Sequence, residues 1–270
     1  MVRIKRLMRK IEVQMPKTIL IYLINLENKL RKSGSYLTYN RESQMYLIRD
    51  KDYSLFFPRK ARVSLYTHGL SARLRYLYDA YGFNQIDFAG VKLFIDCGAN
   101  VGELSIIVNY KHDLQILAVE PEKKEFECLE RNLKGSNCDL VNGLLWDEEG
   151  VLQVYSKPNS GDSSVFMSEA SLPDFKTNSY RLDNLVKIIG IESLVSILKV
   201  EAEGAEPEVI TGTKEYLPNC KYVTFDGGPE RGMGKLTTFV LNGEILAKNN
   251  FEKVYTFDLR NIELWKNKNY

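Results

Sequence analysis

From residue 91 onward, short apolar runs alternate with stretches of helical periodicity. The runs have the length of buried strands, and they cover 91–97, 114–119, 139–145, 195–200 and 222–225. The helical stretches cover 101–111, 123–133, 182–189, a segment that begins at Pro207, and 236–249. Alternating strands and helices form a parallel sheet with right-handed crossovers. Two final strands, 254–257 and 262–265, are separated by a tight turn and add an antiparallel edge. We therefore predict an α/β, Rossmann-like sheet with helices on both faces.

The first 85 residues follow other patterns. Residues 1–32 favour a helix with a broad apolar stripe, punctuated by Pro16 and ended near Gly34. Alternation at 45–48 and 53–57 predicts a hairpin, and 71–80 predicts a helix with Ser71 as its N-cap. Further along, 151–155 predicts an added strand and 157–177 a polar loop. We divide the chain into a helix and hairpin extension, 1–85, and an α/β domain, 86–270.

The net charge of the chain is only +2, but residues 1–32 carry nine lysines and arginines against two glutamates. Three interpretations of this basic segment stay open: packing on its own domain or on the partner in a homodimer, contact with an anionic membrane surface, and contact with nucleic acid. We favour the first and expect no nucleic-acid partner. The apolar run Ile19–Ile24 is far shorter than the roughly 20 residues of a spanning helix. Four separated cysteines are typical of reduced thiols, so we expect a cytoplasmic protein, with peripheral contact at the inner membrane face as the alternative.

The first strand of the domain runs into a glycine-bearing turn, Asp96-Cys97-Gly98-Ala99-Asn100-Val101-Gly102-Glu103. Gly98 and Gly102 allow the backbone to turn tightly and to approach a ligand. Ligands of such sheets bind beyond the carboxyl ends of the strands. The next strand ends in Glu120, whose carboxylate suits a ribose diol. The pattern indicates a nucleotide-type ligand.

The turn favours S-adenosylmethionine over a dinucleotide. Asn100 and Glu103 stand where a dinucleotide fingerprint has its second and third glycines. Glu103 stabilises the helix dipole but opposes a pyrophosphate at the same place. S-adenosylmethionine has no phosphate, and Asp96 is placed to face the amino group of its methionine. A P-loop is excluded because the sequence lacks GK[ST].

Several segments together resemble the FkbM-type S-adenosylmethionine-dependent methyltransferases. They are the turn at 94–103, Val119-Glu120-Pro121-Glu122, Arg181-Leu182-Asp183-Asn184-Leu185 and the strongest match, Leu198-Lys199-Val200-Glu201-Ala202-Glu203-Gly204-Ala205-Glu206. The resemblance covers about 91–225, and 226–232 is similar to a sub-branch. It implies a seven-stranded methyltransferase sheet and a cofactor site made of Asp96, Gly98, Ala99, Asn100, Gly102, Glu120, Pro121 and Asn142.

The resemblance also implies O-methylation of a sugar, glycan or polyketide-type acceptor. We expect Glu201 and Glu203 to project from one face of a strand as proton acceptors, although the family usually has Asp where Glu201 stands. Lys199 shares that face, and the alternative is a Lys–Glu ion pair with Glu206 capping the next helix. Paired carboxylates also suit a divalent metal, but we assign no metal site. Weaker hypotheses place Asp183 and Ser163 in catalysis, His68 beside the cofactor, and Asp226, Glu230 and Arg231 in an acceptor loop.

Three rival functions stay open. A nicotinamide oxidoreductase shares the fold but needs the dinucleotide turn. A nucleic-acid methyltransferase is expected to show a basic face and an N-P-P-Y-type pocket, which the sequence lacks. A non-catalytic protein that binds an adenosine ligand would keep Gly98 and Glu120 without needing the Glu201 and Glu203 face.

Overall fold

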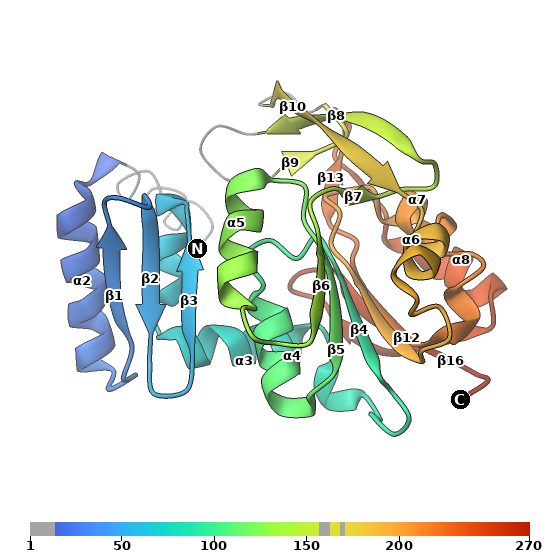
Figure 1. Cartoon of the computed structure of the whole chain (residues 1–270), viewed down its shortest axis with the longest axis horizontal. Helices are drawn as coiled ribbons and strands as arrows, with labels where there is room; N and C mark the ends of the chain where they lie inside the picture. The colour runs from blue at the N-terminus through green and yellow to red at the C-terminus, as the bar shows by residue number, and fades with distance from the viewer. Residues whose placement is uncertain (1–13, 157–162, 168–170) are drawn as a thin grey trace.

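The computed structural model describes residues 14–156, 163–167 and 171–270 (Figure 1). Its central sheet has seven strands in the order β15-β16-β12-β11-β4-β5-β6. Their bounds are β4 Leu93–Cys97, β5 Gln115–Val119, β6 Cys138–Val141, β11 Ser196–Val200, β12 Cys220–Asp226, β15 Phe251–Phe257 and β16 Ile262–Asn267. The strands from β12 to β6 are parallel, and β16 and β15 are antiparallel additions. The seven-stranded, Rossmann-like sheet predicted from the sequence is confirmed.

Helices cover both faces of this sheet (Figure 1). On one side lie α4 (Glu103–His112) and α5 (Lys123–Asn132); on the other lie α6 (Leu182–Ile189), α7 (Glu206–Thr211) and α8 (Phe239–Lys248), with the short helix η3 at Leu217–Asn219. Alternate residues of β4 point to opposite faces of the sheet. Phe94 packs in one apolar core, and Leu93 and Ile95 pack in the other. All five residues of β4 are buried, which explains its continuous apolar run.

The N-terminal extension shares its core with the sheet. It contains α2 (Lys17–Leu30), β1 (Tyr36–Asn40), β2 (Met45–Arg49), β3 (Ser54–Phe57), η1 (Lys60–Tyr66), α3 (Leu70–Ala80) and η2 (Phe83–Gln85). The strands form one antiparallel sheet beside α5, and β1 was missed by the sequence prediction (Figure 1). Leu37 and Phe57 belong to the same buried cluster as Phe94 and Ile116. The boundary at residue 85 therefore does not separate two cores.

Only part of the predicted stripe on α2 is buried. Leu20 and Ile24 face the core together with Asn28, whereas Leu23, Leu26 and Leu30 are exposed. Most of the basic residues of the segment lie in 1–13, outside the described residues. Membrane contact through this segment therefore stays a prediction. Within the described ranges, no helix combines the length and apolarity needed to cross a bilayer.

A second, smaller sheet corrects two predictions. Its order is β7-β10-β8-β9, with β7 at Leu144–Leu145, β8 at Gly150–Ser156, β9 at Ser163–Ser164 and β10 at Leu172–Tyr180. The predicted strand 139–145 is thus split between two sheets, because Gly143 lies between them against the ring of Tyr180. The predicted loop 157–177 contains β9 and the first part of β10. A short ribbon of β13 (Pro229–Arg231) and β14 (Leu236–Thr237) occupies the start of the predicted helix 236–249.

Candidate active site

A cavity of about 450 Å³ opens at the carboxyl ends of β4 and β11. Three parts of the chain line it: the turn after β4, the loop after β11, and the N-terminal extension. The turn between β15 and β16 adds Arg260. The residues that line it include Arg62, Arg73, Tyr81, Gly98, Glu103, Glu201, Glu203, Glu230 and Arg260. The predicted site at this sheet edge is therefore a real hollow, with walls that the sequence patterns assigned to separate domains.

The turn after β4 requires its glycines. Gly98 has φ +70°, and a Cβ at this position would lie 1.9 Å from the carbonyl oxygen of Glu201. Gly102 has φ +84°, and a Cβ there would meet the Leu129 side chain at 2.7 Å. Asn100 also has a positive φ, of 51°, which asparagine tolerates better than most residues. The turn is thus enclosed by the backbone of Glu201 on one side and by the side chain of Leu129 on the other.

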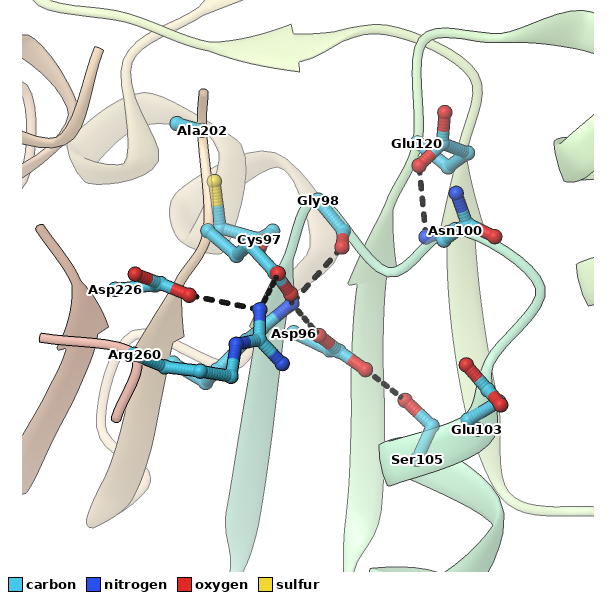
Figure 2. A network of polar contacts seen from close by, with 12 residues as sticks. Asp96, Cys97, Gly98, Asn100, Glu103, Ser105, Glu120, Ala202, Asp226 and Arg260 are labelled. Atoms are coloured by element: carbon cyan, nitrogen blue, oxygen red, sulfur yellow. Dashed lines mark hydrogen bonds and ion pairs between the residues drawn. The ribbon is translucent and has the colours of Figure 1, made fainter. Parts of the chain in front are cut away.

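Glu120 lies at the end of β5 and faces this turn (Figure 2). Its carboxylate accepts hydrogen bonds from the backbone N–H of Asn100 at 2.7 Å and of Glu122 at 2.8 Å. Burial raises the pKa of Glu120 to about 8, against the opposing effect of the Glu122 N–H. Each oxygen keeps a second lone pair for a ligand hydroxyl. Asn142 donates to the backbone oxygens of Glu120 and Pro121, so its amide holds this corner in shape.

An apolar slot of about 70 Å³ adjoins the larger cavity. It is lined by Val119, Pro121, Leu144, Leu145, Trp146 and Val165. Gly98, Glu201 and Glu203 line both hollows, and so does Ser163. The site therefore has an apolar arm and a polar arm that meet at the Gly98 turn, with Glu120 beside that turn.

Asp96 does not present a free carboxylate to a ligand. One oxygen accepts from the Ser105 hydroxyl at 2.6 Å, and the other lies 3.0 Å from the Lys199 ammonium (Figure 2). Lys199 also donates to the backbone oxygens of Cys97 and Gly98. Burial works to lower the pKa of Lys199, but Asp96 and Glu201 raise it overall. The predicted contact of Asp96 with an amino group is therefore corrected: Asp96 and Lys199 hold the turn together.

Glu201 and Glu203 reach the cavity from a loop. Strand β11 ends at Val200, and Glu203 has φ +49°, so the expected same-face spacing on a strand is wrong. Glu201 lies 2.6 Å from Arg260 and 3.3 Å from Lys199. Burial would raise the pKa of Glu201, but these two cations hold it far below its usual range. Glu201 is therefore a poor proton acceptor.

Arg260 joins the carboxylate of Asp226 to that of Glu201. Its guanidinium lies 2.7 Å from Asp226 as well as contacting Glu201 (Figure 2). Burial raises the pKa of Asp226 to about 6, and the charge of Glu201 adds to the effect. Glu230 folds back over Gly228, where its Oε1 and the Oδ1 of Asp226 lie 3.1 and 3.4 Å from an added Cβ. Burial and the charge of Asp226 raise the pKa of Glu230 to about 8.

Other predicted site residues lie away from the cavity. Asp183 is 1% exposed, is paired with Arg181, and accepts the backbone N–H groups of Glu215 and Tyr216. Its predicted catalytic role is therefore corrected to a structural one. His68 is exposed and contacts Thr67. Arg231 pairs with Glu208, and Glu206 accepts the N–H groups of Ala202 and Gly204, which fixes the loop that carries Glu203.

The sequence patterns missed the contribution of the extension. Glu103 is buried and pairs with both Arg62 and Arg73, and it accepts the Tyr66 hydroxyl at 2.9 Å. Burial would raise the pKa of Glu103, but Arg73 and Arg62 hold it at about 2. The charge of Glu103 is thus more than balanced, so its predicted repulsion of a pyrophosphate is wrong. An acidic residue in a first helical turn gives no sign of distant arginines that neutralise it.

No protein-family model matches the sequence, and no curated protein matches it. Among solved structures, the N-terminal domain of human METTL16 in complex with SAH is similar at 12% identity and a TM-score of 0.40, over 92% of this chain and 81% of that one. A precorrin-6y C5,15-methyltransferase from Geobacter metallireducens is similar at 13% identity and a TM-score of 0.35, over 61% and 65% of the two chains. An rRNA methylase from Streptococcus thermophilus is similar at 11% identity and a TM-score of 0.40, over 71% and 96%. Identities and TM-scores this low transfer no activity, so function has to be argued from the site.

Proposed function

We propose that the protein is an S-adenosylmethionine-dependent methyltransferase. The supporting observation is the pair of joined hollows at the Gly98 turn, one apolar and one polar, with the Glu120 carboxylate beside them. Adenine suits the apolar slot beside Trp146, and the ribose diol suits Glu120. The charged methionine part then extends into the polar cavity. When bound, the cofactor supplies an electrophilic methyl group.

We infer that the acceptor is a hydroxyl of a sugar, glycan or polyketide-type compound. The polar cavity is lined by hydrogen-bond donors and acceptors, including Tyr81, Glu230 and Arg260. Such a lining suits a ligand rich in hydroxyl groups. Tyr81 is 1% exposed, and its hydroxyl lies near the Glu201 carboxylate. Burial raises the pKa of Tyr81 well above its ordinary value, so it stays a hydrogen-bond donor.

The residues of this chain would act mainly by positioning. Holding an acceptor oxygen in line with a methyl group contributes roughly 7–11 kcal/mol through effective molarity. A proton acceptor adds about 10²–10⁴-fold. Glu201 is too strongly ion-paired for that task, which leaves Glu203 and Glu230. The pKa of about 8 suits Glu230 to act as a base near neutral pH.

Calorimetry and methyl transfer test the proposed function together. We expect S-adenosylhomocysteine to bind the full chain and NADH to leave it unbound. Tritium transfer from labelled S-adenosylmethionine to a panel of glycans and polyketides would then identify the acceptor class. Binding of NADH alone would support the nicotinamide alternative. Cofactor binding without transfer to any acceptor, RNA included, would favour a non-catalytic adenosine-ligand protein.

A further inference from the structure

The wall of the cavity that the extension supplies holds two buried guanidinium groups around one carboxylate. Arg73 contacts Glu103 through Nε at 3.0 Å and through Nη2 at 3.2 Å. Arg62 pairs with the second oxygen of the same carboxylate through its Nη2. The side chains of Arg62 and Arg73 are only 17% and 15% exposed, and both line the cavity.

The charges in this cluster do not cancel. Burial raises the pKa of Tyr66, so its hydroxyl contributes no negative charge, and Glu103 is ionised. Two arginines against one glutamate leave one positive charge in excess. Buried charges are costly unless they are paired and hydrogen-bonded. The buried Nε of Arg62 also has no hydrogen-bond partner in the described part of the chain, so the cluster keeps one N–H donor for a further acceptor.

The other two cations that line the cavity, Lys199 and Arg260, have carboxylate partners of their own. Lys199 is matched by Asp96 and Glu201, and Arg260 is matched by Glu201 and Asp226. An anion that enters the cavity therefore finds its free positive charge at Arg62 and Arg73. Ala99 and Asn100 of the cofactor turn line the same hollow. The anion is thereby placed at the cofactor end of the cavity.

We propose that Arg62 and Arg73 form a carboxylate subsite, which binds the carboxylate of the methionine part of S-adenosylmethionine. This inference rests on the proposed function. A guanidinium presents paired donors that match the geometry of a carboxylate, and one such charged hydrogen bond contributes about 1.5–3 kcal/mol. The extension is then part of the cofactor site, and the sheet alone would bind the adenosine part without holding its amino-acid end.

Two ligands that differ only in the carboxylate test the subsite. Calorimetry would compare S-adenosylhomocysteine with its decarboxylated analogue on the full chain, on Arg73→Met and on Arg62→Met. The unaltered chain should prefer S-adenosylhomocysteine by about 10- to 100-fold. Each single variant should reduce this ratio at least fivefold while affinity for the analogue changes little. Each variant keeps one arginine on Glu103, and thermal melting would confirm that it is folded.

Arg75→Met is the matched control, because Arg75 lies on the same helix but is exposed to solvent. It should keep the full preference, and Arg73→Lys should keep part of it. An equal affinity of the unaltered chain for both ligands would overturn the subsite, and any anion held there would belong to the acceptor. A preference that survives both methionine substitutions would also overturn it. Failure of the unaltered chain to bind either ligand would instead contradict the proposed cofactor.

Discussion

The backbone oxygen of Glu201 occupies the space into which any side chain at position 98 would have to project. The separation of 1.9 Å from an added Cβ is far below a van der Waals contact. The backbone N–H of Glu201 also donates to the carbonyl oxygen of Cys97, so the two loops are hydrogen-bonded next to the glycine. The Gly98 turn and the Glu201–Glu203 loop are therefore in direct backbone contact.

Gly98→Ala should displace this contact and weaken cofactor binding at least tenfold. The clash is with backbone, which cannot move aside as a flexible side chain can. Gly90→Ala is the control, because Gly90 also has a positive φ, of 77°, but has open space around its Cβ position. The control should lose only about 1 kcal/mol of stability, from backbone strain. Calorimetry with S-adenosylhomocysteine and urea unfolding measure the two effects, and equal behaviour of the variants would count against the contact.

Affinity for S-adenosylmethionine should rise with pH through Glu120. The pKa of its carboxyl in the free protein is about 8, so the group is largely protonated at neutral pH. Ribose hydroxyls donate to the ionised form and lower this pKa, so binding releases a proton. The affinity should therefore increase from pH 6.5 to about 8 and level off above it. Glu120→Gln should bind more weakly and show a flat profile; a rise that persists in this variant would assign the titration elsewhere.

Removal of the Glu103 carboxylate should destabilise the protein strongly. Glu103→Gln leaves two buried arginines without their anion, which we expect to cost about 3–5 kcal/mol in urea unfolding. Glu27→Gln breaks an exposed pair with Arg31 and should cost at most about 1 kcal/mol. The pKa of Glu103 falls from 4.5 to about 2 on folding. Its stabilisation is therefore complete above pH 4.5 and is lost as the pH falls toward 2, so the two variants should differ less at pH 3 than at pH 7.

The proton acceptor can be identified by comparing two variants, Glu230→Gln and Glu203→Gln. Glu230→Gln should reduce kcat at least tenfold, with unchanged binding of S-adenosylhomocysteine. Its removal should also abolish an increase of kcat toward pH 8, where Glu230 becomes ionised. Glu203→Gln tests the other candidate in the same assay, with the acceptor that tritium transfer identifies. The variant that keeps full turnover is removed from the mechanism.

Apolar runs made the central sheet predictable, because its middle strands β4, β11 and β12 are buried along their whole length. The loop 157–177 was misjudged because β10 is largely exposed and has no apolar alternation to signal a strand. The shared core across the proposed boundary at residue 85 was not predictable for a different reason. Leu37 and Phe57 pack into the same core as Phe94, and local periodicity does not report which distant face completes a core.

The candidate site was predicted where chemistry follows from position along a strand, as at Gly98 and Glu120. Side-chain contacts in the site were not predicted where the two residues are distant in sequence. The sequence around Glu201 does not predict its contact with Arg260, which lies 59 residues later. The sequence around Glu103 likewise does not predict its contact with Arg62. Asp183 shows the converse: a carboxylate in a familiar motif is occupied by two backbone N–H groups of a neighbouring loop.

The turn between β15 and β16 places Arg260 between Glu201 and Asp226, and β16 lies between β15 and β12 in the sheet. During synthesis, residues 251–257 cannot join the sheet until 262–267 have followed them out of the ribosome. A nascent chain therefore carries the carboxylates of Glu201 and Asp226 without their shared cation until this last hairpin closes. The pocket is consequently the last part of the domain to be completed, and a chain that stalls before residue 260 lacks the cation that joins Glu201 to Asp226.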